Sequence, residues 1–142
     1  MPPPPPMTPP PDFNIFLALC RPTPAEKSGR WLLILSRPLG DPILETSCIT
    51  YQAAAMRLIS APGRWHCLKE SDKPFTYPDV HARYRLGTIK ESQVWMVDEA
   101  GRGADPSCGR QRFVLGMVRS LEEQGILERG AGDFYGRLVD ER

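Results

Sequence analysis

The sequence predicts one small α+β domain in which a mostly antiparallel sheet packs with two helices. Three observations lead to this fold class. The chain has 142 residues, 41% apolar and 25% charged, which suits a single domain and is too short for two cores of normal size. Short apolar runs separated by proline and glycine occupy its earlier part. Segments with helical spacing follow toward the C-terminus.

The N-terminal stretch Met1–Pro11 contains eight prolines. Proline fixes φ and removes the backbone donor, so this stretch cannot join a helix or a sheet. We therefore predict a disordered proline-rich tail over residues 1–11 and a single domain over residues 12–142. Such a tail can bind the aromatic groove of an SH3-like partner, although a plain solvated leader is the simpler expectation.

The predicted strands are short and bounded by turn residues. Asn14–Cys20 and Trp31–Ser36 are continuously apolar and too short for typical helices, which predicts two central strands buried on both faces. The remaining strands are predicted at Ser47–Gln52, Met56–Ser60, Arg64–Leu68 and Val80–Leu86.

Two helices are predicted after the strands. Thr88 and Glu91 have the spacing of a capping box, which predicts a helix from about Ile89 to Ala100 that Gly101 closes. The second helix is expected to begin after Asp105 and Pro106, because aspartate is a good N-cap and proline suits the first helical position. Its apolar side chains recur at three-to-four spacing and end near Gly125: Phe113, Val114, Met117, Val118 and Leu121.

Cys108 is the candidate catalytic residue, because it falls in the first turn of this second helix. There the unpaired N–H groups and the helix dipole stabilise a thiolate and lower the pKa of the thiol. Arg110 and Arg112 are close enough in sequence to add to this effect. The alternative is that Cys108 is a small buried residue that seats the helix.

A cysteine nucleophile needs a histidine within hydrogen-bond reach to take its proton. The sequence has two histidines, His66 and His81, so both are candidate bases. Each can instead be a surface or structural histidine. The histidines and cysteines do not show the close paired spacing of structural zinc sites, so no metal is expected.

Four segments of the chain form a recognisable pattern: Asn14–Leu19 with Arg21 and Pro22, Arg30–Leu35, Ser107–Val114 and Leu121–Leu127. They resemble a group of small fungal proteins, over about residues 13 to 130. That group is similar to the permuted papain-like fold of the NlpC-type peptidases and the lecithin retinol acyltransferase family. In those enzymes a histidine before a tryptophan opens an early strand, and an asparagine–cysteine pair opens a later helix that carries the nucleophile.

The resemblance implies that Cys108 occupies the nucleophile position, with Ser107 in place of the asparagine, and that Arg30 occupies the histidine position. Arginine stays protonated and cannot act as a general base, although it can hold a thiolate or a carboxylate. Because the histidine position is occupied by an arginine, the resemblance supports the fold more than the activity. The candidate substrate-binding residues are Arg30, Trp31 and Gln111.

Charge and cysteine usage limit the class of partner. The 18 basic and 17 acidic residues give a net charge of +1, so neither nucleic acid nor a membrane is the expected partner. Four cysteines without a C-x-x-C pair, and no recognisable signal peptide, predict reduced thiols and a cytoplasmic protein. No glycine-rich phosphate loop is present and no cofactor is expected.

Three functions therefore compete. In the first, a papain-like protein acts on a small organic substrate through Cys108, as a hydrolase, an acyl transferase or a tailoring enzyme of fungal secondary metabolism. In the second, the chain is a non-catalytic binding or scaffolding domain derived from that fold. In the third, the pocket serves a cyclisation or isomerisation that needs no cysteine nucleophile.

Overall fold

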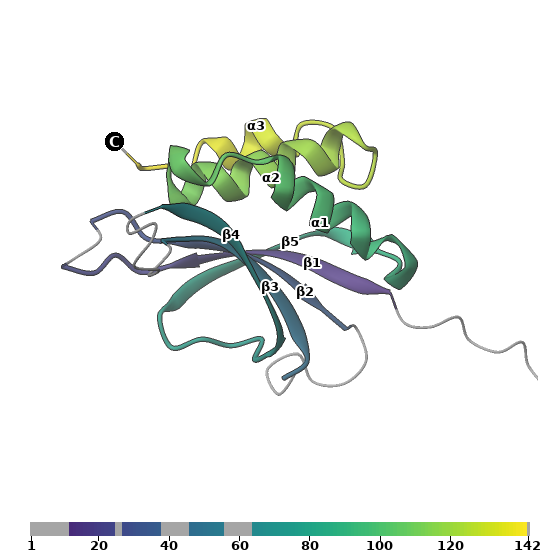
Figure 1. Cartoon of the computed structure of the whole chain (residues 1–142), viewed down its shortest axis with the longest axis horizontal. Coiled ribbons are helices and arrows are strands. Elements are labelled where there is room, and N and C mark those ends of the chain that lie inside the picture. The colour runs from purple at the N-terminus through teal and green to yellow at the C-terminus, as the bar shows by residue number, and fades with distance from the viewer. Residues whose placement is uncertain (1–11, 25–26, 38–45, 56–63, 142) are drawn as a thin grey trace, which may run out of the picture.

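Within the part of the chain that the structure describes, five strands form one antiparallel sheet, and the helices cover one of its faces (Figure 1). The structure, a computed structural model, describes residues 12–24, 27–37, 46–55 and 64–141. The order across the sheet is β4-β3-β2-β1-β5, and every neighbouring pair is antiparallel. The α+β class and the mostly antiparallel sheet are thus confirmed. The strands are β1 (Phe13–Cys20), β2 (Trp31–Ser36), β3 (Cys48–Ala55), β4 (Trp65–Lys73) and β5 (Val80–Ile89).

The two predicted central strands are confirmed. Strand β2 is buried along its whole length, as its unbroken apolar sequence predicts, and β1 beside it is buried at most positions. Strands β3, β4 and β5 begin close to their predicted starts and run further than predicted. The predicted strand Met56–Ser60 and the predicted tail Met1–Pro11 lie outside the described residues.

The predicted start of the first helix is wrong. Thr88 and Ile89 continue strand β5, because they pair with Asn14 and Phe13 of β1. A 3₁₀ turn over Glu91–Gln93 then leads into helix α1 (Val94–Gly103), which runs through Gly101.

The second predicted helix is divided. Asp105 does act as an N-cap, since its carboxylate accepts a 2.9 Å hydrogen bond from the N–H of Ser107. It caps only the 3₁₀ turn Pro106–Cys108, however, and helix α2 (Arg110–Glu123) begins after Gly109, whose φ of 123° favours glycine.

The end of α2 near Gly125 is confirmed. Gly125 has a φ of 79°, and the N–H of Ile126 bonds to the carbonyl of Leu121 at 3.0 Å, which is a Schellman motif. A third helix, α3 (Ala131–Gly136), packs on α2, so the expectation of two helices is wrong. None of the helices in the described part of the chain is long and apolar enough to span a membrane.

The sheet buries apolar side chains on both faces. We call the side covered by the helices the helix face and the other side the far face. The far-face cluster is smaller, and Phe75, from the connection between β4 and β5, packs edge-to-face on Phe16 there at 4.9 Å. Its buried members are Ala18, Cys20, Leu32, Ile34, Cys48, Phe75 and Val80. The helix-face core includes Ile15, Leu17, Trp31, Leu33, Tyr51, Val97, Phe113, Met117 and Leu121.

Candidate functional site

Cys108 is exposed at the end of the 3₁₀ turn that precedes α2. Its thiol donates a hydrogen bond of 2.9 Å to the backbone carbonyl of Asp105. Partial burial and the carboxylates of Asp105 and Glu141 raise the pKa of Cys108, and they outweigh its own backbone N–H and the nearby Arg112. The predicted lowering of this pKa is therefore wrong. The alternative of a buried filler is wrong as well, because the side chain is exposed.

The start of helix α2 is already occupied by a carboxylate. Glu141 Oε1 accepts hydrogen bonds from the backbone N–H groups of Gln111 and Arg112, each 2.9 Å long. Arg112 Nη2 in turn donates to the backbone carbonyl of Glu141 at 3.1 Å. A Cβ at Gly109 would lie 2.5 Å from Glu141 Oε1, so only glycine leaves room for this contact. The groups expected to stabilise a thiolate therefore bind Glu141 instead.

His66 projects away from Cys108. Its neighbours on β4, Trp65 and Cys67, both pack against the helix-face core. Because successive side chains of a strand point to opposite faces, His66 lies on the far face. The turn that carries Cys108 is on the helix face, since the Arg110 guanidinium that follows it stacks 5.1 Å from the centre of the Trp65 ring. The sheet therefore separates this candidate base from the thiol.

His81 is exposed on strand β5, at the other edge of the sheet from β4. The 3₁₀ turn that carries Cys108 contacts β4 and β3. Neighbouring strands are about 4.8 Å apart, so roughly 19 Å separates β4 from β5. His81 is thus out of hydrogen-bond reach of Cys108, and neither histidine supplies the base that a cysteine nucleophile needs.

The predicted substrate-binding residues also do not share a site. Arg30 Nη2 binds Asp79 Oδ2 at 3.1 Å, and the guanidinium also contacts the thiol of Cys20 on the far face. Trp31 points the other way and is buried in the helix-face core, with 2% of its surface exposed. The strand alternation that separates these two neighbours explains why they cannot line one pocket together.

Gln111 is a buried clamp. Its Nε2 donates to the carbonyl of Gly29 at 2.7 Å and to Asp140 Oδ1 at 2.5 Å, while its Oε1 accepts from the N–H of Asp140 at 2.8 Å. Both amide protons are used, so the side chain has no donor left for a substrate. It ties the start of α2 to the chain before β2 and to the C-terminal segment.

A polar network that the sequence analysis missed joins β3, β4 and α1. Tyr51 donates to Asp98 Oδ1 at 2.6 Å, and Lys69 Nζ lies 2.8 Å from the same oxygen. With Cys67 and Arg102 these residues line a pocket of about 310 Å³. Tyr51 and Lys69 are opposite each other in the register of β3 and β4, but no sequence spacing connects them to Asp98.

The charges of this network are satisfied within it. Burial, followed by the Asp98 carboxylate, raises the pKa of Tyr51 well above its ordinary value. Burial also acts to raise the pKa of Asp98, but hydrogen bonds from Lys69 and Tyr51 outweigh it and hold this pKa below its ordinary value. Tyr51 therefore stays protonated and Asp98 stays ionised near neutral pH, an arrangement that stabilises the fold and offers no base poised near pH 7.

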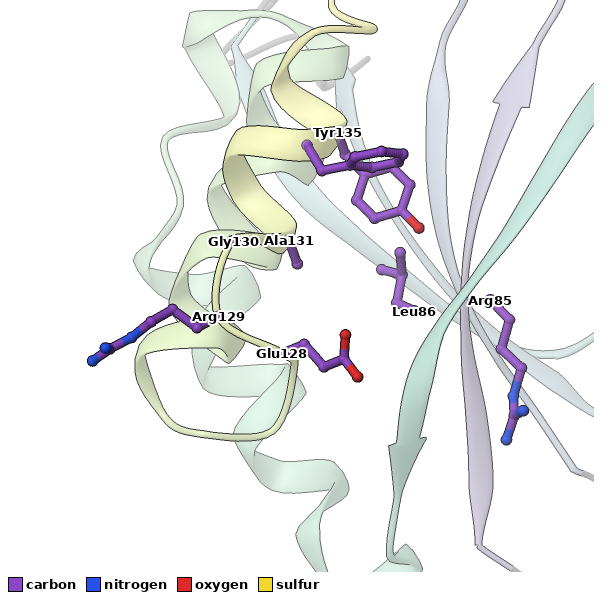
Figure 2. Close-up of a pocket in the computed structure, with 8 residues that line it drawn as sticks. Arg85, Leu86, Glu128, Arg129, Gly130, Ala131 and Tyr135 are labelled. Carbon is purple, nitrogen blue, oxygen red and sulfur yellow. The ribbon is translucent and has the colours of Figure 1, made fainter.

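A second pocket, of about 340 Å³, lies between strand β5 and helix α3 (Figure 2). Leu86 and the ring of Tyr135 point into it, and so does the carboxylate of Glu128, whereas Arg129 extends outward. Phe134 stacks edge-to-face on Tyr135 at 4.9 Å and is 58% exposed. The lining residues are Arg85, Leu86, Glu128, Arg129, Gly130, Ala131, Phe134 and Tyr135.

A wider and more open hollow of about 580 Å³ lies between α2 and α3. Two of its arginines already have partners, because Arg119 binds Asp133 at 3.2 Å and Arg112 binds the backbone of Glu141. These contacts hold α3 and the C-terminal segment against α2. The pocket beside β5 is thus the better candidate for a ligand.

No protein-family model, curated protein or solved structure matches the chain. The assignment of a function therefore depends on the geometry of these sites.

Proposed function

We propose that this chain is a non-catalytic binding domain with a permuted papain-like ancestry, located in the cytoplasm. The observation that carries the proposal is the separation of Cys108 from both histidines. His66 lies on the opposite face of the sheet, and His81 lies on the strand at the opposite edge. A thiol without a base, with a raised pKa, is a weak nucleophile near neutral pH. The ancestry is supported by the resembling segments, and the location by four free thiols.

Three further contacts support loss of the catalytic centre. Arg30, at the position of the expected histidine, is bound to Asp79. Glu141 fills the helix start that would hold a thiolate or an oxyanion. Gln111 is committed to backbone and carboxylate partners. The ligand site of the proposed binding domain is the pocket between β5 and α3, which combines apolar walls with exposed charged residues.

Deleting each candidate base tests the proposal. The rate at which iodoacetamide alkylates Cys108 near neutral pH is measured by peptide mass spectrometry in the wild type, His66→Asn and His81→Asn. A general base contributes about 10²- to 10⁴-fold, so its loss would be plain in this assay. We expect both variants to react within about twofold of the wild type, since neither histidine contacts the thiol. A drop of about tenfold or more in one variant would overturn the proposal and identify that histidine as the base.

A further inference from the structure

The outer edge of strand β5 is open to another strand. Strand β5 lies at one end of the sheet order, and among the described residues its only strand partner is β1. An edge of this kind presents unpaired backbone N–H and C=O groups, which are a template for an added strand. At ten residues, β5 is long enough to hold such a segment in a continuous ladder.

The pocket of Figure 2 opens at this edge. Arg85 lies opposite Phe16, whose side chain packs on the far face, whereas Leu86 packs against the helix-face core. Residues that point to opposite faces can line one pocket only where that pocket reaches round the outer edge of the strand. A chain that pairs with β5 would therefore pass directly over the pocket.

The charge of β5 selects the partner. The strand carries His81, Arg83 and Arg85 and has no acidic residue. Arg83 and Arg85 lie opposite Ala18 and Phe16, so both belong to the far face. Arg85 is exposed and has no ion pair among the described residues. Acidic side chains placed opposite these arginines form favourable cross-strand pairs.

Two other occupants fit less well. A second copy of β5 would bring basic side chains against basic side chains, which is destabilising across a strand pair. The chain's own segment Met1–Pro11 has eight prolines and no acidic residue, so it lacks both the N–H donors for a ladder and the charge.

We propose that the outer edge of β5 binds an extended acidic peptide segment by strand addition. Its acidic side chains, at alternate positions, face Arg83 and Arg85, and an apolar side chain between them enters the pocket beside Leu86 and Tyr135. Glu128, whose carboxylate points into that pocket, excludes an acidic side chain from the apolar position (Figure 2). This inference rests on the proposed function, because it names the partner class of the binding domain.

The test is a titration with fluorescein-labelled peptides. The probe has the sequence Glu-Val-Glu-Phe-Glu-Val-Glu; one control has lysine in place of each glutamate, and a second has proline in place of one valine and of the glutamate that follows it, so that a donor is lost whichever edge of the peptide pairs with β5. The acidic probe is expected to bind, and both controls are expected to bind at least about tenfold more weakly, because one loses the charge match and the other loses a ladder donor. Hydrogen exchange should show protection of alternate β5 amides on binding.

Charge reversal on the protein separates this site from general attraction. Arg85→Glu is expected to lower the affinity for the acidic probe at least about tenfold and to raise the affinity for the lysine control. Arg102→Glu is the matched control, because Arg102 is 71% exposed on α1 and lines no part of the β5 pocket. Both substitutions are at exposed positions, and circular dichroism checks that each variant is folded.

Several outcomes would overturn the inference. The first is binding of the proline control with the same affinity as the acidic probe, and the second is an equal loss of affinity in Arg85→Glu and Arg102→Glu. The third is competition by polyuridylate that Arg85→Glu abolishes, which would indicate a nucleic-acid site. The fourth is a dimer of the chain that Arg85→Glu converts to a monomer. If the acidic probe does not bind and Cys108 is unreactive, this inference is wrong and the proposed function is kept. If the probe binds and is then cleaved in a Cys108-dependent way, the inference is kept and the proposed non-catalytic function is wrong.

Discussion

Glu141 Oε1 accepts a 2.9 Å hydrogen bond from the backbone N–H of Gln111, in the first turn of helix α2. The same oxygen accepts from the N–H of Arg112, so one carboxylate satisfies two donors that the helix itself cannot pair. Its negative charge is also one of the causes of the raised pKa of Cys108. The C-terminal segment therefore stabilises α2 and disfavours the thiolate at the same time.

Neutralising this carboxylate should lower the pKa of Cys108. Glu141→Gln keeps an oxygen that can accept from the two N–H groups and removes the charge, so the alkylation midpoint should move to lower pH with little loss of stability. Glu141→Ala should give the same direction of shift and also cost about 1 kcal/mol of unfolding free energy, as for other lost helix caps. Alkylation profiles and urea unfolding measure the two effects. An unchanged midpoint in Glu141→Gln would contradict this account of the thiol.

Removing the Gln111 clamp should destabilise the domain. Gln111→Ala leaves the carbonyl of Gly29 and the backbone N–H of Asp140 without their partner, and a buried unpaired group costs about 1–3 kcal/mol. Gln124→Ala, near the other end of α2, is the control because Gln124 is exposed and its side chain bonds, among the described residues, only to Ser120 Oγ at 3.2 Å. Urea unfolding should show the larger loss for Gln111→Ala; equal losses would argue against a clamp.

The ionised carboxylate of Asp98, which is bound by Lys69 and Tyr51, should contribute to stability in a pH-dependent way. The folded pKa of Asp98 is lowered, so the unfolded state binds its proton at higher pH and stability is lost as pH falls from about 5 through the ordinary value of about 3.9 and below. Asp98→Asn should remove this part of the acid dependence. Urea unfolding from pH 7 down to pH 3 measures it, and an acid limb as steep as that of the wild type would contradict the prediction.

At neutral pH, Tyr51→Phe should cost roughly 1.5 kcal/mol, as expected for a hydrogen bond to a charged group. Tyr84→Phe serves as the control, because its hydroxyl makes no hydrogen bond with the described residues while its ring contact with Tyr135 is kept. A loss of the same size in both variants would show that the Asp98 contact is not responsible.

Two glycines of α1 should respond differently to alanine. A Cβ at Gly101 would lie 3.0 Å from Cys67 Sγ and 3.5 Å from Met117 Cε, whereas a Cβ at Gly103 would meet nothing within 4 Å. Gly103→Ala should therefore raise the free energy of unfolding by about 0.5–1 kcal/mol, whereas Gly101→Ala should give no such increase because its Cβ crowds Cys67. Adding Cys67→Ala to Gly101→Ala should recover part of the increase. Thermal unfolding of the variants decides, and equal gains at the two sites would refute the close contact.

The elements that local sequence could predict are those whose own composition determines them. Trp31–Ser36 is apolar at every position but the last, and β2 is buried throughout. The capping box at Thr88 predicted a helix start that is wrong, because pairing of Thr88 and Ile89 with β1 overrides the local helix signal. Helix α3 was missed because its six residues include two glycines; it is held by contacts with α2, among them Glu122 Oε1 to the N–H of Gly132 at 2.8 Å.

The candidate site was harder to predict because its properties come from distant residues. Cys108 can be identified from its local position, but its raised pKa depends in part on Glu141, which is 33 residues further along the chain. The place of His66 depends on which face of β4 it occupies, which is decided by the packing of Trp65 and Cys67. The β5 pocket brings together two segments that meet only in the folded chain.

The pH profile of Cys108 alkylation tests the central claim most directly. A binding domain without a catalytic base predicts one ionisation with a midpoint above about 8.5, the ordinary value for a free cysteine, and little reaction near neutral pH. Cys108→Ser identifies the modified peptide, since the other cysteines are buried or partly buried. A profile that reaches its plateau below about pH 7 would contradict the account, because it would require a thiolate held by a partner.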